Sequence, residues 1–249
     1  MSDKEIAMSP QQRKFAESSN PLKAYKNLVV GKDASWFHFL GYEFYTTFFS
    51  NIPGLLGFGT RSLLAPRLIA SGGKGLALGR GVNIRTPKKL SLGKGVIIDD
   101  YACLDIRNSS EKASGISIGD HVFLGRYTNI VARDAEIKLG AACNISSHCR
   151  IGSISGIEIG ESALIAAYVY IGCGNHNSDD PDKPIMEQGM EDKGGVKIGR
   201  NVWIGTRATI LDGVTIGDNA IIGAHSLVRE DVPDNAIVAG TPAKVIRTR

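Results

Sequence analysis

A repeat of six residues governs the apolar and polar positions in much of the chain. From Ile198 the sequence divides into IGRNVW, IGTRAT, ILDGVT, IGDNAI and IGAHSL, each with an aliphatic residue first and a small or β-branched residue fifth. This period fits neither an α-helix, at about 3.6, nor an alternating strand, at about 2. Three sixes extend over ~60 Å at about 3.3 Å per residue. They are typical of one triangular coil of a parallel β-helix.

The same frame continues over about 140 residues. Successive coils open with the aliphatic residues Leu92, Ile118, Leu139, Ile159, Ile198 and Ile216, and they turn again at Ile98, Leu104, Leu124, Ile130, Ile145, Ile151, Ile165, Ile171, Ile204, Ile210, Ile222 and Val228. We expect the fifth positions to point inward, and these are Ala102, Val122, Thr128, Cys143, Cys149, Ser155, Ala163, Val169, Val202, Ala208, Val214, Ala220 and Ser226. The sequence therefore predicts an all-β solenoid over residues 76–232, followed by a C-terminal tail at 233–249.

Extra residues interrupt this frame at a few corners. Short insertions are expected at 108–115, 136–138 and 157–158, and a long excursion at 173–195 reads CGNHNSDDPDKPIMEQGMEDKGG. Insertions of this length in a solenoid usually lie on one face and often carry function.

Residues 1–75 follow a different pattern, which predicts an N-terminal arm and a helical cap. Residues 1–20 are polar, lack the apolar core of a signal peptide, and are expected to fray. Short helices are expected from Pro21 to Gly73. They should cover the open first coil, as a solenoid requires. The alternative is peripheral membrane contact through residues 36–70, with the anchors Trp36, Phe37, Phe39, Tyr42, Phe44, Tyr45, Phe48 and Phe49.

Composition narrows the choice of partners and compartment. The net charge of +4, without a dense basic stripe, favours an anionic small ligand over nucleic acid. The four cysteines include no CxxC pair, and Cys143 and Cys149 fall in inward positions. We therefore expect buried thiols and a reducing, cytoplasmic setting. If the N-terminal segment contacts a membrane, we expect the protein to lie on the inner membrane face.

The five histidines differ in their place within the frame. His38 belongs to the aromatic N-terminal segment and is expected to pack there. The outward fourth positions hold His121, His148 and His225, whereas His176 stands where a coil gives way to the long excursion. An imidazole has an unperturbed pKa of about 6.5 and can act as a base at neutral pH. His176 is therefore the candidate base.

Several motifs together resemble the hexapeptide-repeat O-acetyltransferases, especially the maltose and galactoside enzymes and the sugar acetyltransferases of surface-polysaccharide biosynthesis. These motifs are NHNSDD in the excursion, the VWIG coil, IGDNAIIGAHSLV, and the closing VPDNAIVAGTPAKVI. The resemblance covers residues 76–247. It implies a left-handed β-helix, a homotrimer, a sugar or glycan acceptor, no metal, and acetyl-CoA bound as co-substrate between neighbouring prisms.

The resemblance also implies roles for individual residues. His176 matches the general base, and the backbone N–H of Thr206 matches the oxyanion donor. Gly205, Thr206 and Ala224 match turns that contact the pantetheine. The matching positions near the adenosine phosphates are Lys244 and Arg247, and Arg229 falls at a further contact position. Ser146 stands where the galactoside enzymes have an acceptor-contacting asparagine, and Tyr168 and Asn175 are further acceptor candidates.

Alternatives remain at this point. Cys173 could form an acyl-enzyme with His176, and Asp179, Asp180 or Asp182 could orient the imidazole. An N-acetyltransferase acting on an amino sugar is the runner-up reaction. A zinc-dependent γ-type carbonic anhydrase would use His121, His148 and His176, but its close histidine pair is absent from the sequence. A non-catalytic scaffold is the third class.

Overall fold

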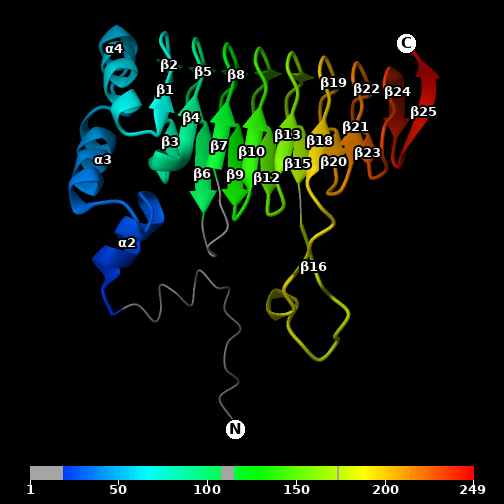
Figure 1. The fold of residues 1–249 in the computed structure, drawn as a ribbon, viewed down its shortest axis with the longest axis horizontal. Helices are drawn as coiled ribbons and strands as arrows, with labels where there is room; N and C mark the ends of the chain where they lie inside the picture. The colour runs from blue at the N-terminus through cyan, green and yellow to red at the C-terminus, as the bar shows by residue number, and fades with distance from the viewer. Residues whose placement is uncertain (1–18, 108–114, 173) are drawn as a thin grey trace.

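The computed structural model describes residues 19–107, 115–172 and 174–249. Most of the polar arm, the 108–114 insertion and Cys173 therefore lie outside the described residues. Figure 1 shows short strands stacked along one axis, with the N-terminal helices at one end of the stack and the C-terminal strand at the other.

Within these residues the strands form three long sheets, which we call sheets A, B and C, and each coil contributes one strand to each sheet in turn. Sheet A contains β1 (Ser71–Gly72), β4 (Leu90–Leu92), β7 (Gly115–Ile118), β10 (Glu136–Leu139), β13 (Ile157–Ile159), β18 (Val196–Ile198) and β21 (Thr215–Ile216). Sheet B contains β2 (Ala77–Leu78), β5 (Ile97–Ile98), β8 (Phe123–Leu124), β11 (Asn144–Ile145), β14 (Leu164–Ile165), β19 (Trp203–Ile204), β22 (Ile221–Ile222), β24 (Ala236–Gly240) and β25 (Ala243–Thr248). Sheet C contains β3 (Asn83–Arg85), β6 (Cys103–Arg107), β9 (Asn129–Arg133), β12 (Arg150–Ser153), β15 (Tyr170–Gly172), β20 (Thr209–Ile210) and β23 (Leu227–Val228).

The strand register confirms the six-residue frame. The predicted opening residues pair along sheet A as Leu92–Ile118, Ile118–Leu139, Leu139–Ile159, Ile159–Ile198 and Ile198–Ile216. The predicted turning residues pair in the same way along sheet B and sheet C. Gly72 already pairs with Leu92, so the first paired strand precedes residue 76.

The inward positions build one continuous core. All the opening and turning residues and nearly all the predicted fifth positions are buried, and they belong to a single apolar cluster with the polar Thr128 and Ser226 beside it. Stacking these small side chains in parallel layers lets each coil bury its aliphatic residues against the next, which is what stabilises a solenoid.

Ser155 is the exception, and its predicted inward position is wrong. The neighbouring Ser153 is buried instead, and its Oγ accepts the Ser155 N–H at 2.9 Å. The strands β9 and β12 extend further than the six-residue repeat predicts, because Ser153 still pairs with Ala132. The insertions predicted at 136–138 and 157–158 are misplaced, because these residues belong to paired strands of sheet A. The inserted residues lie earlier in the chain.

The N-terminal helices pack on the first coils. They are α2 (Pro21–Val29), α3 (Trp36–Phe48) and α4 (Gly54–Leu64), followed by the 3-10 turn η1 (Ala65–Arg67). Ser35 starts α3, because its side chain accepts the His38 N–H at 3.1 Å. Tyr45, Ala65 and Ile69 join the core of the coils. No helix in the described ranges is long and apolar enough to cross a membrane.

Three cysteines in the described ranges are free thiols, and Cys143 and Cys149 are buried as predicted. Burial raises the pKa of each of these two thiols, which lowers the reactive thiolate fraction. We expect Cys143 and Cys149 to resist a thiol reagent such as Ellman's reagent in the native protein and to react fully in denaturant.

Mass-spectrometric mapping of labelled peptides checks this prediction. The half-buried Cys103 provides the internal comparison and should be labelled first. Rapid native labelling of Cys143 and Cys149 would contradict the packed interior.

Candidate active site

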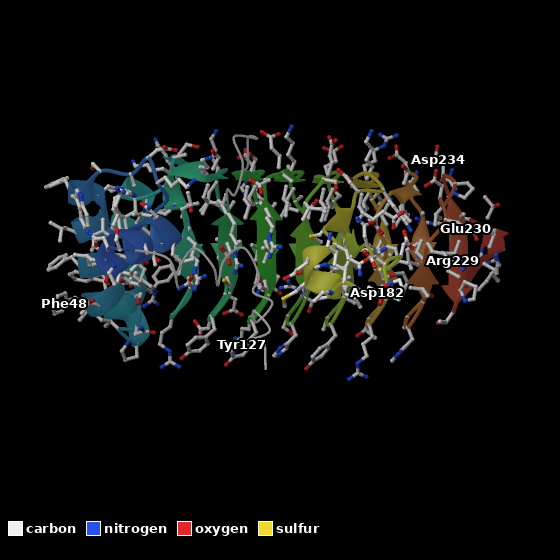
Figure 2. The ribbon with its side chains drawn as sticks, turned by 90° about the horizontal axis from the view of Figure 1, so that it is seen from below. Phe48, Tyr127, Asp182, Arg229, Glu230 and Asp234 are labelled. Atoms are coloured by element: carbon white, nitrogen blue, oxygen red, sulfur yellow. The ribbon has the colours of Figure 1, made fainter. Side chains whose placement is uncertain are left out.

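The turns from sheet B to sheet C form one edge of the prism, which we call the B–C corner. The corresponding edges are the A–B corner and the C–A corner. Five predicted site residues lie on four successive turns of the B–C corner, namely Ser146, Tyr168, Gly205, Thr206 and Ala224. In Figure 2, Tyr127 marks the B–C corner, Asp234 marks the A–B corner on the opposite side, and Asp182 of the excursion lies between them, facing the viewer.

Gly205 is required on this edge because consecutive coils approach too closely for a side chain. A Cβ added to Gly205 would lie 2.6 Å from the backbone nitrogen of Ala224. The predicted pantetheine-contacting turns at 205–206 and 224 are therefore packed directly on one another.

The backbone N–H groups at the third position of each six have different partners from coil to coil. At the A–B corner those of Lys94, Arg200 and Asp218 donate to the carboxylates of Asp120, Asp218 and Asp234 of the following coil, at 2.8–2.9 Å. At the B–C corner the equivalent N–H groups of Thr206 and Ala224 donate to no protein acceptor in the described part of the chain. These two donors are therefore available to a ligand.

The Thr206 side chain is held away from this role. Its hydroxyl donates to the carbonyl oxygen of Ala167 at 2.7 Å. This bond fixes the turn across two coils and leaves the Thr206 N–H as the group that can serve an oxyanion.

A ladder of stacked rings continues the B–C corner toward the N-terminus, and sequence reasoning missed it. Adjacent ring centroids are 5.4, 5.0 and 4.8 Å apart along Tyr101, Tyr127, His148 and Tyr168. The spacing follows from the distance between neighbouring strands. The guanidinium groups of Arg80 and Arg207 cover the two ends of the ladder, at 5.2 and 5.3 Å.

Within the ladder, the rings of Tyr168 and His148 stack on one another, and both residues are exposed at the corner. Both have positive φ values, 63° and 59°, which is the left-handed conformation of the corner. The signal in the sequence is the ring-bearing residue at the fourth position of four successive B–C sixes.

His176 lies on the long excursion, which has its own hydrogen-bonded structure. Asn175 and His176 form β16 (Asn175–His176), which pairs antiparallel with β17 (Met190–Glu191). The Asn177 side chain donates to the Gln188 carbonyl at 3.1 Å, and the excursion also contains η3 (Ile185–Glu187). At its return, Asp192 accepts a hydrogen bond from Ser155. The imidazole of His176 and the side chain of Asn175 are exposed.

The three acidic candidates do not orient this imidazole in a single protomer. Asp180 accepts the Asp182 N–H at 3.0 Å, and the Asp180 N–H donates to the Gln188 side chain at 3.1 Å. No carboxylate in the described residues, Asp179 included, is hydrogen-bonded to His176. The Cys173 alternative falls on a residue outside the described ranges.

His176 and Thr206 belong to different corners of one prism. The excursion leaves sheet C after β15 at the C–A corner, whereas Thr206 precedes β20 at the B–C corner. The width of sheet C separates them. One protomer therefore does not bring the candidate base and the candidate oxyanion donor together.

The predicted basic residues gather at the C-terminal end of the prism. Arg229 and Lys244 both approach the carboxylate of Glu230, at 3.7 Å each. Arg247 lies on β25, opposite Ile237 of β24. All three basic side chains are exposed and can reach an anion at this end.

The three histidines of the carbonic anhydrase alternative occupy three different edges. His121 is on the A–B corner, His148 on the B–C corner, and His176 on the excursion at the C–A corner. One protomer cannot direct them to a common zinc ion. Across residues 19–107, 115–172 and 174–249, no three His, Cys, Asp or Glu side chains form a group that could hold a metal.

Comparison with known proteins identifies the repeat. Residues 195–230 match the family described as "Bacterial transferase hexapeptide (six repeats)". The chain therefore carries the hexapeptide repeat of the bacterial transferases over these residues. A Mycobacterium tuberculosis protein described as a probable acetyltransferase is 34% identical over 167 residues, which are 67% of this chain and 52% of that protein. WbbJ of Escherichia coli, named for O-acetyl transfer in lipopolysaccharide biosynthesis, is 37% identical over 109 residues, which are 41% of this chain and 56% of that protein.

The chain thus spans about half the length of these curated relatives. Among solved structures, AntD, an N-acyltransferase from Bacillus cereus in complex with dTDP and 3-hydroxybutyryl-CoA, matches with a TM-score of 0.53 at 21% identity. That match covers 81% of this chain and 90% of the other. The likeness concerns the fold, which is the left-handed parallel β-helix predicted from the resemblance.

Proposed function

We propose that this chain is an acetyl-CoA-dependent O-acetyltransferase that modifies a sugar hydroxyl in surface-polysaccharide or glycolipid biosynthesis. The observation that carries the proposal is the pair of N–H groups at Thr206 and Ala224, which donate to no acceptor in the described residues. In the same two coils the N–H groups of Arg200 and Asp218 at the A–B corner donate to aspartates. The relatives named as acetyltransferases give the reaction class.

The residues of the B–C corner and the C-terminal end suit acetyl-CoA. The turns at Gly205 and Ala224 offer backbone donors to the amides of the pantetheine. Arg229, Lys244 and Arg247 offer cations to its phosphates, because charge-assisted contacts to phosphate are stronger than neutral ones. Acetyl-CoA supplies an activated thioester, and this chain supplies the base, the oxyanion donor and the positioning.

His176 accepts the proton of the sugar hydroxyl as the hydroxyl oxygen forms its bond to the acetyl carbon. The Thr206 N–H stabilises the negative charge that develops on the carbonyl oxygen. The carbon–sulfur bond then breaks, and the imidazolium of His176 returns its proton to the departing thiolate. Ser146, Tyr168 and Asn175 are the proposed acceptor contacts.

The proposed assembly is a homotrimer in which each site lies between two prisms. Two features support it. The base and the oxyanion donor lie on different corners of one protomer, so a neighbour can supply the missing partner. The outer face of sheet B also carries an apolar row, in which the exposed Leu164 and Trp203 pair with one another and Trp203 pairs with the half-buried Ile221. The outer face of sheet A instead carries Lys138, Glu158 and Lys197.

Two measurements test the proposal. Acetyl-CoA at 100 times its Kd should stabilise the protein by about 2.7 kcal/mol, seen as a rise in Tm. Radiolabelled acetyl-CoA should transfer label to a hydroxyl within a panel of sugars, amino sugars, oligosaccharides and lipid-linked glycans. Absence of both effects would refute the function, and label on an amine would establish the N-acetyl alternative.

A further inference from the structure

The outer face of α3 is apolar. Its exposed side chains include Phe37, Leu40, Phe44 and Phe48, spaced so that they share one side of the helix. Phe37 is 87% exposed. The remaining exposed positions of this helix are Trp36, Gly41 and Thr47, so no exposed residue of α3 is charged.

The neighbouring helix α4 repeats this feature. Leu55 and Leu56 are 87% and 70% exposed, and Phe58 and Leu63 are exposed as well. The sole charged residue within α4 is Arg61, which is buried and donates to backbone carbonyls of Leu78 and Ile52. A helix surface in contact with water normally carries charged residues, so these two faces together are unusual.

The cap role does not account for this surface. The cap uses the inward sides of the helices, where Tyr45, Ala65 and Ile69 pack on the first coils. Phe37, Leu55 and Leu56 point away from that core and remain exposed in the described structure. The two sequence interpretations are therefore compatible, since one side of the segment covers the solenoid and the other is free.

The charge around this surface is mostly positive. Between residues 19 and 98 the chain has eleven Lys and Arg residues but two carboxylates, Asp33 and Glu43, whereas the rest of the chain has more carboxylates than basic residues. Exposed basic side chains precede and follow the helices, at Lys23, Lys32, Arg67, Lys74 and Lys88.

We propose that the outer face of α3 and α4 docks this protein on a lipid bilayer with anionic headgroups. Apolar and aromatic side chains beside lysines and arginines are what an interfacial helix presents to such a surface. A second copy of the chain fits less well, because it would bring two basic surfaces together. This contact does not depend on the acetyl transfer proposed above.

Vesicle flotation with the full-length protein tests the docking. Binding to vesicles of phosphatidylglycerol and phosphatidylcholine should exceed binding to pure phosphatidylcholine and should weaken with added NaCl. The triple variant Phe37→Ser, Leu55→Ser, Leu56→Ser should lower the binding constant at least about tenfold. Since all three side chains are exposed, its Tm should stay that of the parent.

The matched control replaces exposed apolar residues at the opposite end of the prism. Val245 and Ile246 on β25 are 58% and 64% exposed, and Figure 1 places that strand at the other end from α3 and α4. Val245→Ser, Ile246→Ser should leave flotation unchanged. Equal binding by the triple variant and the parent, or no binding by either, would overturn the proposal. So would a triple variant that changes the sedimentation coefficient instead of lipid binding, because the face would then be a contact between copies.

Discussion

His176→Ala is expected to lower kcat for acetyl transfer about 10²- to 10⁴-fold, which is the usual contribution of a positioned general base. The imidazole is exposed on β16 and packs against no core residue, so the variant should fold like the parent. The dissociation constant of acetyl-CoA should change little, because the proposed co-substrate contacts lie on the B–C corner. Steady-state kinetics and calorimetric titration with acetyl-CoA measure the two quantities.

A second exposed histidine provides the control for this substitution. His121→Ala removes an exposed imidazole from the A–B corner, away from both the excursion and the proposed co-substrate edge. It should retain the parent kcat. Near-normal turnover in the His176 variant would remove the residue from its proposed role, whatever the fold.

Ala224→Trp is expected to weaken acetyl-CoA binding at least about tenfold, or ~1.4 kcal/mol. Ala224 is exposed on the B–C corner, and its N–H, like that of Thr206, donates to no protein acceptor in the described residues. An indole at this position occupies the volume in front of both donors. The side chain points outward, so the core is not disturbed. Titration of the purified variant with acetyl-CoA gives the dissociation constant.

Ala141→Trp is the matched control, because it places the same side chain at the same position of a six. Ala141 is also exposed but lies on the A–B corner. It should bind acetyl-CoA as the parent does. If the two variants bind acetyl-CoA equally well, the B–C corner is not the co-substrate edge, and the roles proposed for Thr206 and Gly205 are refuted with it.

Much of the fold follows from the frame of six. An aliphatic residue in every first position and a small one in the fifth can be buried together only if the coils stack in phase, and the pairing of Leu92 through Ile216 follows that phase. The frame misplaced Ser155, because β12 extends past its six and buries Ser153 instead. The six-residue repeat does not predict which residues point inward where a strand is longer than the repeat implies.

The candidate site could also be predicted only in part from the sequence. His176 stood out because it begins an excursion, and the turns at Thr206 and Ala224 stood out through their motif. The sequence could not show that their N–H groups lack acceptors within the described residues, since this depends on which side chain of the next coil lies beside each turn. Nor could it show the ring ladder, because the contact between His148 and Tyr168 joins residues one coil apart.

The sequence by itself determined the prism, its inward residues and the place where the excursion leaves it, because a repeat dictates local geometry at every position. Only the tertiary structure decided that the N–H groups of Thr206 and Ala224 have no acceptor in the described residues, and that His176 and Thr206 lie across the width of sheet C from one another. It also decided that the apolar residues of α3 and α4 divide into a packed side and an exposed side. These are relations between segments far apart in the chain, and side-chain identity alone does not determine the distances between such segments.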